Sequence, residues 1–565
     1  MKKVRRLAKT NSETAVPKPA PSWNWWPWAA AFAALIVALE IYSPAMHGPF
    51  VLDDRTLPYM APTIEGAPFR AWIGVRPLLM FTFWLNYQSA GPEPFGYHLV
   101  NVLLHFLGSV VVALIAARLL SWVSVEGPKR DALAVLAGAL FLVHPVQTES
   151  VAYVASRSEA LSVLFFYSGL AVFLYRGDES MGWLRALASV TLFGAAVATK
   201  EHTAVFPIVV IVTDYFWKRG GLRKNAFFYA LVAICGAAGA VMVYRVLGNT
   251  PTAGFRTGEF TPLTYFYTQC RVVWTYVRLF VLPFGQNVDP DVEISHTILE
   301  HGALFGLLAL AAVLVAAWVY RKKWPLASYG AILFVILLAP TSSFVPILDP
   351  AAERRLYLPF LGLTLIVLEA ARRLKLSQII WIGAAVCLVF SALAYQRSEL
   401  WGDPVALWAD AATKSPHKMR PHFQLGYEYY VAGNCAQSAA SYEAASKLTP
   451  PRFDLLMDWA LSLDCAGDEH KALDVLHEAE RYDNGAHVHA TLGMVYAKLG
   501  QKDEALQELT IAERADPRFE ATYIYRGNIA EAAGDRASAA REYQRALSIN
   551  PQNPMAREAY ARVAR

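Results

Sequence analysis

The sequence predicts an all-α protein in two parts, a polytopic membrane domain followed by a soluble array of helical repeats. Of its 565 residues, 55% are hydrophobic and 17% are charged, whereas ordinary soluble domains carry about 25% charged residues. Apolar runs follow one another from Trp28 to about Tyr395, and the chain from Trp401 onward reads as soluble helix. We therefore predict three segments: a cytoplasmic N-terminal tail (1–27), a membrane domain (28–397) and an extracytoplasmic repeat domain (398–565).

The first apolar run is predicted to remain in the protein as a membrane helix. A basic stretch from Met1 to Arg6 and a cluster of tryptophans precede it, and no clear small-residue cleavage site follows it. A span needs about 20 mostly apolar residues, so we expect about eleven spans. They are residues 28–46, 98–120, 132–146, 159–175, 184–199, 203–217, 226–247, 302–320, 325–341, 356–371 and 378–396.

Basic residues fall in alternate loops between these runs, which is typical of loops on the cytoplasmic side. Examples are Lys129-Arg130, Lys218-Arg219 and Arg321-Lys322-Lys323. Because the net charge of +5 lies in such loops, it does not suggest nucleic-acid binding. With the N-terminus inside, this order places the repeat domain and the loop after the first span outside the membrane.

One further apolar segment, residues 268–284, is not expected to span the membrane. Arg271 and Arg278 fall on nearly one face of the helix that it would form, which is typical of an amphipathic or re-entrant helix. A twelfth span would also move Arg321-Lys322-Lys323 to the outside, against the charge pattern.

The second part of the chain has a strong internal period. Glycines recur at intervals of 34, 33 and 34 residues, at Gly433, Gly467, Gly500 and Gly534. Five residues after each stands a small residue, where paired helices would touch: Ser438, Ala472, Ala505 and Ala539. This is the tetratricopeptide pattern. We expect four repeats over about 416–551, a capping helix over 552–565 and a helix over 402–414 that docks the array on the membrane domain. Such arrays mostly bind polypeptide on a concave face.

Two cysteines of the repeat domain have alternative interpretations. Cys435 begins the second helix of the first repeat, and Cys465 ends the first helix of the next. Because antiparallel neighbours bring those ends together, a disulfide is possible if the domain is extracytoplasmic. The alternative is that both are small buried residues.

Two adjacent aspartates, Asp53 and Asp54, follow the first span closely. A charged pair at a membrane boundary is costly to dehydrate, so it is either a solvated loop or a working site. A carboxylate on the external side can act as general base toward an acceptor hydroxyl. We predict that this pair is catalytic and leave open which aspartate is the base.

Other polar groups interrupt the apolar runs on the predicted external side. Cations there can hold a departing phosphate, and our candidates for donor-phosphate binding are Arg157, Lys200, Arg354 and Arg355. Further site candidates are His98, His144, Glu149, Glu201, His202 and Tyr357. Taken singly, each is better explained by an internal ion pair or a solvated helix cap, and it is the whole set that favours a site. Water-soluble nucleotide sugars are not expected outside the cytoplasmic membrane, so the topology favours a lipid-linked sugar donor.

Several short motifs resemble those of one known family, in the same order along nearly the whole chain. They are Phe50-Val-Leu-Asp-Asp54, Arg76-Pro-Leu78 with Leu85-Asn-Tyr87, His98-Leu-Val-Asn-Val-Leu-Leu-His105, His144-Pro-Val-Gln-Thr-Glu-Ser-Val-Ala-Tyr153, Arg157-Ser-Glu159, Lys200-Glu-His202 and Glu353-Arg-Arg-Leu-Tyr-Leu-Pro359. Together they resemble the TMTC proteins, which are transmembrane and tetratricopeptide-repeat protein O-mannosyltransferases of the GT-C superfamily.

This resemblance implies a GT-C fold with its active site between the first external loop and the membrane. It also implies a polyprenyl- or dolichyl-phosphate sugar donor, with mannose as the expected sugar, and transfer to Ser or Thr of a protein. The family's acidic pair matches Asp53 and Asp54. The chain departs from the family in its short array and in His202, where glutamine is more usual, and these departures suggest a bacterial relative.

We therefore predict an inverting glycosyltransferase of the bacterial inner membrane, with the repeats presenting an acceptor polypeptide. No metal is expected, although the two aspartates with Glu149 or Asp289 nearby would suit a divalent ion. An alternative within the same enzyme class is a glycosyltransferase whose acceptor is a lipid or a glycan. In a different class, the protein would be a non-catalytic membrane scaffold for polysaccharide export, and its external polar residues would be dispensable.

Overall fold

The computed structural model describes residues 26–61, 64, 66–74, 76–176, 180–218, 221–249, 253–254 and 260–564. Residues 1–25 of the predicted tail lie outside the described residues. Within the described ranges every regular element is a helix, and an isolated bridge joins Ala253 to Ile347. The all-α prediction is confirmed.

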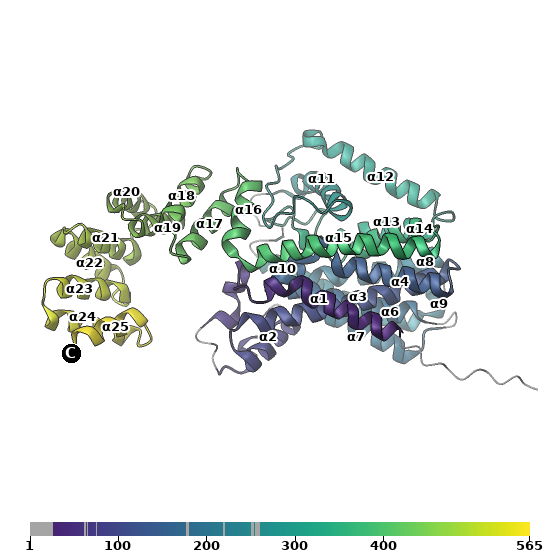
Figure 1. The fold of residues 1–565 in the computed structure, drawn as a ribbon, viewed down its shortest axis with the longest axis horizontal. Helices are drawn as coiled ribbons and strands as arrows, with labels where there is room; N and C mark the ends of the chain where they lie inside the picture. The colour runs from purple at the N-terminus through teal and green to yellow at the C-terminus, as the bar shows by residue number, and fades with distance from the viewer. Residues whose placement is uncertain are drawn as a thin grey trace, which may run out of the picture.

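The helices of the membrane domain run alongside one another in a bundle, except α12, which is drawn apart from the others and oblique to them, and the repeat array extends from one end of the bundle (Figure 1). They are α1 (Trp26–Met46), α3 (Pro94–Trp122), α4 (Gly127–Val143), α6 (Arg157–Leu174), α7 (Trp183–Thr199), α8 (Phe206–Trp217), α10 (Ala226–Asn249), α12 (Ala303–Val319), α13 (Pro325–Leu338), α14 (Phe360–Ala371) and α15 (Leu376–Gly402). Short elements between them include α2 (Pro77–Ala90), α5 (Thr148–Ala152), α9 (Gly221–Lys224) and α11 (Pro262–Val281).

Several of these helices have the length and composition of membrane spans. In the described part of the chain, six are long and apolar enough to cross a membrane, and a seventh results if α4 and its bent continuation count as one. Shorter apolar helices are α7, α13 and α14. The 20-residue helix α11 is not among either group. The predicted number of about eleven spans stays a prediction.

The bend after α4 has a local cause. Pro145 has no N–H to continue the helix, and the His144 ring accepts a hydrogen bond from the Val146 N–H at 3.2 Å. The next helical segment, Pro145–Ala152, turns by 51°. It thereby returns toward the bundle and carries Glu149 to the end where the repeats begin.

Glycines allow two pairs of helices to touch backbone to backbone. A Cβ added to Gly330 of α13 would lie 2.4 Å from the Gly362 carbonyl oxygen of α14. A Cβ added to Gly402, at the end of α15, would lie 2.7 Å from the Pro44 carbonyl oxygen of α1. The second contact fixes the end of α1 just before the aspartate pair.

The last membrane helix runs farther than the sequence predicted. It ends at Gly402 rather than at residue 396, past the predicted domain boundary at 397. Asp403 then caps α16 (Pro404–Lys414) by accepting hydrogen bonds from the backbone N–H groups of Val405 and Ala406. The predicted docking helix is therefore α16, and it buries Leu407 and Trp408.

Four helix pairs and a last helix make up the repeat array. They are α17 (Met419–Val431) with α18 (Cys435–Ser446), α19 (Phe453–Cys465) with α20 (Glu469–Glu480), α21 (Ala486–Lys498) with α22 (Lys502–Ala515), α23 (Glu520–Ala532) with α24 (Arg536–Ile549), and α25 (Pro554–Val563). The four periodic glycines have φ between 77° and 82°, a left-handed conformation that glycine adopts without steric cost. They close the first helix of each pair, as predicted.

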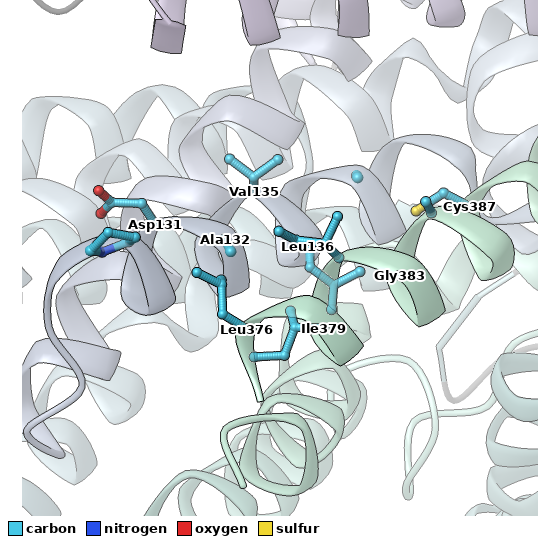
Figure 2. Close-up of a pocket in the computed structure, with 12 residues that line it drawn as sticks. Asp131, Ala132, Val135, Leu136, Leu376, Ile379, Gly383 and Cys387 are labelled. Carbon is cyan, nitrogen blue, oxygen red and sulfur yellow. The ribbon is translucent and has the colours of Figure 1, made fainter. Parts of the chain in front are cut away.

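An apolar groove of about 600 Å³ lies between α4 and α15 (Figure 2). Leu136, Ile379 and Gly383 line it, and Asp131 is its acidic residue. The groove follows the first halves of both helices, away from the residues that end α15 and precede α16. It contributes no cation to the site described next.

Candidate active site

The two aspartates lie in very different surroundings. Both belong to a short 3-10 helix, η1 (Leu52–Thr56), directly after α1. The Asp53 side chain is exposed, whereas Asp54 is fully buried. One Asp54 oxygen accepts a hydrogen bond from the Ala155 N–H at 2.7 Å, and the other accepts one from the Val51 N–H at 3.3 Å. Asp54 therefore ties residues 50–57, which we call the aspartate loop, to the segment after α5. Of the two aspartates, only Asp53 offers its carboxylate to an incoming molecule.

The burial of Asp54 also changes its acidity. Burial raises the pKa of its carboxyl to about 7, although the hydrogen bonds from Ala155 and Val51 act in the opposite direction. At neutral pH, Asp54 is therefore only partly ionised. This suits a residue that organises backbone more than one that must hold a full negative charge.

Tyr153 joins the aspartate loop to the segment after α5 and to the end of α15. Its hydroxyl accepts a hydrogen bond from the Asp53 N–H at 3.0 Å, and its ring stacks on Trp401 at the end of α15. Its pKa is raised, first by burial and then by the carboxylates of Asp53 and Asp54, while Arg354 acts in the opposite direction. Tyr153 directly follows α5, and Glu149 of the same helix binds Arg354.

Three cations at this end of the bundle are each paired with a carboxylate and remain partly accessible. Arg354 binds Glu149, and its side chain is 27% exposed. Lys200 lies 2.5 Å from Glu159 and is 15% exposed. Arg354 belongs to η9 (Glu353–Leu356), and Lys200 belongs to the turn after α7.

Arg76 is the third cation of this group. It is 32% exposed, and its Nη2 and Nε atoms donate hydrogen bonds of 2.6 and 3.1 Å to the two oxygens of Glu201. Burial lowers the pKa of Lys200, and the positive charges of Arg76 and Arg354 act in the same direction. We call Arg76, Lys200 and Arg354 the cation group.

The two remaining predicted phosphate contacts lie elsewhere. Arg157 is fully buried, and it donates hydrogen bonds to Asn101 Oδ1 and to the Tyr97 carbonyl, both at 2.9 Å. Arg355 is buried as well and donates to the carbonyl oxygens of Asp349 and Pro350. Because both guanidinium groups satisfy protein acceptors inside the fold, we leave them out of the proposed phosphate contacts.

The predicted histidines and Tyr357 also have internal positions. His98 and His144 are buried, and His144 contacts the Phe280 carbonyl at 2.9 Å. Tyr357 is buried against His105, with 2.8 Å between its hydroxyl and Nδ1. His202 lies 3.4 Å from Glu159, beside Lys200, so it belongs to the edge of the cation group.

The acidic residues do not gather into a metal site in the described part of the chain. Glu149 binds Arg354, and Asp289 binds Lys418 and Arg420. Both oxygens of Asp54 already accept backbone N–H groups. No group of three metal-ligating side chains occurs among these residues.

A cavity of about 400 Å³ lies on the other side of η9, between α11, the 285–292 loop and α16. Arg271 and Arg278 of α11 line it together with Lys414 and Glu353. Burial raises the pKa of Glu353 to about 7. This polar cavity therefore borders the segment that carries Arg354.

Three residues of the site were quoted in motifs but given no role by the sequence argument. Arg76 was not distinguished because it stands alone before a proline in a short loop. Tyr153 and Glu159 were not distinguished because a tyrosine or a glutamate beside an apolar run is common. Their roles depend on contacts between elements, and sequence spacing gives no sign of those contacts.

Comparison with known proteins finds relatives of one kind. The tetratricopeptide repeat family matches residues 486–519 and again 521–553. Protein O-mannosyl-transferase F38B6.6 of Caenorhabditis elegans is 24% identical over 454 residues, which cover 74% of this chain and 62% of that protein. The predicted resemblance to the TMTC proteins is confirmed.

Other similar proteins carry the same name of protein O-mannosyl-transferase. Mouse protein O-mannosyl-transferase TMTC3 is 24% identical over 558 residues, covering 85% of this chain and 57% of that protein. Protein O-mannosyl-transferase Tmtc1 of Drosophila melanogaster is 35% identical over 195 residues, covering 31% of this chain and 21% of that protein. The chain spans about three fifths of the first two relatives, at 62% and 57% of their lengths, so their activity is a proposal for this chain.

Proposed function

We propose that this protein is a membrane glycosyltransferase that moves a sugar, mannose in the first instance, from a polyprenyl-phosphate donor to Ser or Thr hydroxyls of a protein. The observation that carries the proposal is the exposed Asp53 carboxylate. Its backbone N–H donates to the hydroxyl of Tyr153, which directly follows α5, and α5 also carries Glu149, the partner of Arg354. A base for the acceptor and cations for the donor phosphate are thus present at one end of the bundle.

Asp53 is the proposed general base. Its carboxylate takes the proton of the acceptor hydroxyl as the hydroxyl oxygen forms a bond to the anomeric carbon of the sugar. The bond from that carbon to the phosphate oxygen breaks, and the electron pair leaves with the polyprenyl phosphate. A single displacement of this kind inverts the anomeric configuration. Asp54 holds the loop that carries Asp53.

The proposed phosphate contacts are Arg76, Lys200 and Arg354. Cations placed where negative charge develops stabilise the transition state, because they need no reorganisation during the reaction. Each is paired with a glutamate. A donor phosphate would therefore share these cations with Glu201, Glu159 and Glu149.

We further propose that this end of the bundle faces the outside of a bacterial inner membrane, with the N-terminus in the cytoplasm. The alternate basic loops support this orientation. So does the disulfide between Cys435 and Cys465, because disulfides persist in oxidising compartments. The repeats then extend from the site into the compartment where an acceptor protein would be found. No metal takes part in the proposal.

The proposal is tested by transfer from radiolabelled polyprenyl-phosphate mannose to a Ser/Thr-rich acceptor protein, with purified wild type and two variants. Asp53→Asn removes the base, so we expect kcat to fall by about 100-fold or more while the unfolding temperature stays the same. Asp54→Asn presents an amide N–H to one of two backbone N–H donors, so it should lower both kcat and the unfolding temperature. Chelation of divalent ions should leave transfer unchanged.

Full transfer by Asp53→Asn would overturn the mechanism, whatever the activity of Asp54→Asn. No transfer by wild type from any of a panel of polyprenyl-phosphate sugars would overturn the function and favour the scaffold. Label that appears on lipid or glycan, and not on protein, would replace the proposed acceptor and leave the site intact.

A further inference from the structure

The aspartate loop is joined directly to the first repeat helix. Arg55 lies two residues beyond Asp53 in η1, and its two terminal nitrogens contact the two carboxylate oxygens of Glu428 in α17 at 2.9 and 3.0 Å. Its guanidinium also lies over the ring of Tyr427, 4.9 Å from the ring centre. Two ion-pair contacts and a cation–π contact thus link one arginine to one turn of the repeats.

The geometry gives this link little freedom. Glu428 is only 4% exposed, and Arg55 is 27% exposed. The third nitrogen of Arg55, Nε, donates a hydrogen bond of 3.0 Å to the Phe50 carbonyl, at the start of the aspartate loop. The planar guanidinium therefore spans the loop and the helix at once, an arrangement that a lysine would not reproduce.

Other contacts hold the first repeat to the membrane domain without touching the aspartate loop. Asp289 pairs with Lys418 and Arg420, and Asp349 pairs with Arg420 at 2.8 Å. Asn287 donates a hydrogen bond to Ser415 at 2.8 Å. These contacts dock α16 and α17 on the 287–290 loop and on the segment before η9. Within the described part of the chain, the Arg55–Glu428 pair is the ion pair that joins η1 to the repeats.

We propose that Glu428 and Arg55 are positioning residues, through which the first repeat helix holds Asp53 in its working place. This inference rests on the proposed function in one respect, the role of Asp53 as base. The 3-10 helix that carries Asp53 is short and ends in loops, so its own hydrogen bonds fix it weakly. The contact of Asp54 with Ala155 holds η1 to the membrane domain, and the Arg55–Glu428 pair holds η1 to α17.

The repeats are then part of the catalytic arrangement as well as a surface for an acceptor. A displacement of about 1 Å at a reacting group can cost about 100-fold in rate. Loss of the pair should therefore lower kcat and leave the KM for the donor nearly unchanged, because the cation group lies on other elements.

The test compares Glu428→Gln with Lys418→Gln in the full-length purified protein. Both variants remove one ion-pair partner between the first repeat and the membrane domain, but only Glu428→Gln affects the aspartate loop. Hydrogen exchange of the backbone amides of residues 52–57 is measured first, because it needs no substrate. We expect exchange there to be about fivefold to tenfold faster in Glu428→Gln, as loss of a partly buried pair permits, and unchanged in Lys418→Gln.

Kinetics of transfer give the second readout. We expect kcat of Glu428→Gln to fall by about tenfold or more with an unchanged donor KM, while Lys418→Gln keeps the wild-type kcat. The variant Arg55→Gln should behave like Glu428→Gln, and the double variant should be no worse than either, because the same contact is lost in each.

Equal exchange in residues 52–57 of wild type and Glu428→Gln would overturn the inference, whatever the activity. An equal fall of kcat in Glu428→Gln and Lys418→Gln would also overturn it, since general docking would then be the cause. Failure of the proposed function looks different: wild type shows no transfer, while the exchange experiment still reports on the link.

Discussion

The raised pKa of the buried Asp54 carboxyl makes the stability of the folded protein depend on pH. Burial raises its pKa to about 7 in the folded protein, whereas an unfolded aspartate has a pKa of about 4. Between these two values the folded state holds a proton that the unfolded state has lost. The stability that this proton contributes is therefore full below about pH 4 and is lost as the pH rises to about 7.

This linkage predicts a pH-dependent difference between wild type and Asp54→Asn, which does not titrate at this position. We expect the unfolding temperature of wild type to fall relative to that of the variant as the pH rises from about 4 to about 7. Thermal unfolding of both proteins in the same detergent measures the difference. Two curves that stay parallel across this range would show that Asp54 does not titrate there.

Two arginines on the same side of the molecule should respond differently to the same substitution. Arg76 is partly exposed and pairs with Glu201, whereas Arg157 is fully buried among carbonyl groups and Asn101. Arg76→Gln should raise the donor KM by about tenfold and leave the unfolding temperature nearly unchanged, because exposed ion pairs contribute about 1 kcal/mol or less.

Arg157→Gln is the matched control for that experiment. It leaves buried acceptors without a partner, so it should cost about 2–4 kcal/mol of stability. The donor KM of the molecules that remain folded should not change. A normal donor KM in Arg76→Gln, together with a raised KM in Arg157→Gln, would reverse our assignment of the two residues.

At the scale of elements, the crossing of α1 and α15 determines where the aspartate loop begins. Gly48 and Gly402 lie against each other's backbones, with a Cβ on Gly48 only 3.0 Å from the Gly402 Cα. The loop with Asp53 follows α1, and the docking helix α16 follows α15. One close contact thus relates the site to the repeats.

Gly402→Ala should disturb both the aspartate loop and the docking helix α16. The new methyl group would meet the Pro44 carbonyl oxygen at 2.7 Å, so α1 must move away from α15. We expect a loss of about 1–3 kcal/mol in stability and a lower kcat. Gly182→Ala is the control, because nothing lies within 4 Å of a Cβ there and its φ is −60°. Equal behaviour of the two alanine variants in thermal unfolding would contradict the role of this contact.

At the scale of the whole molecule, the disulfide relates the fold to the compartment. Cys435 and Cys465 are bonded, while Cys235, Cys270 and Cys387 are free. The sequence had left the pair open between a disulfide and two small buried residues. The antiparallel packing of α18 and α19 brings the two Cα atoms to 5.5 Å, within the range that a disulfide needs.

This pair predicts the outcome of a thiol-labelling experiment on the denatured protein taken from membranes. Three of the five cysteines should react with a maleimide without reductant, and all five should react after reduction. Five reactive thiols without reductant would place the repeats in a reducing compartment and would contradict the proposed orientation.

Much of the fold follows from the sequence because it depends on composition and period. The apolar runs, the repeats and their turn glycines are local patterns, and each matches a helix or a turn in the structure. The end of the last membrane helix was missed, because Arg397 and Trp401 look like the start of a soluble segment. In the fold Arg397 is buried and pairs with Asp410 at 3.3 Å, so the helix continues.

The candidate site was predicted only in part. The aspartate pair stands out in the sequence because two charges are costly beside a membrane, and the structure exposes one of them and buries the other. Lys200 and Arg354 lie in the cation group, while Arg157 and Arg355 are bound inside the fold. Sequence treats all four as external cations, since it cannot show which guanidinium groups already have acceptors.

The sequence by itself determined that this protein has a helical membrane domain, a tetratricopeptide array and an acidic pair after the first span. These are properties of short stretches, fixed by hydrophobicity, periodicity and charge. Only the tertiary structure decided which aspartate is exposed, which cations remain partly accessible and which repeat helix contacts the aspartate loop. Those properties depend on contacts between residues hundreds of positions apart, such as Arg55 with Glu428, and they exist only once the helices have packed.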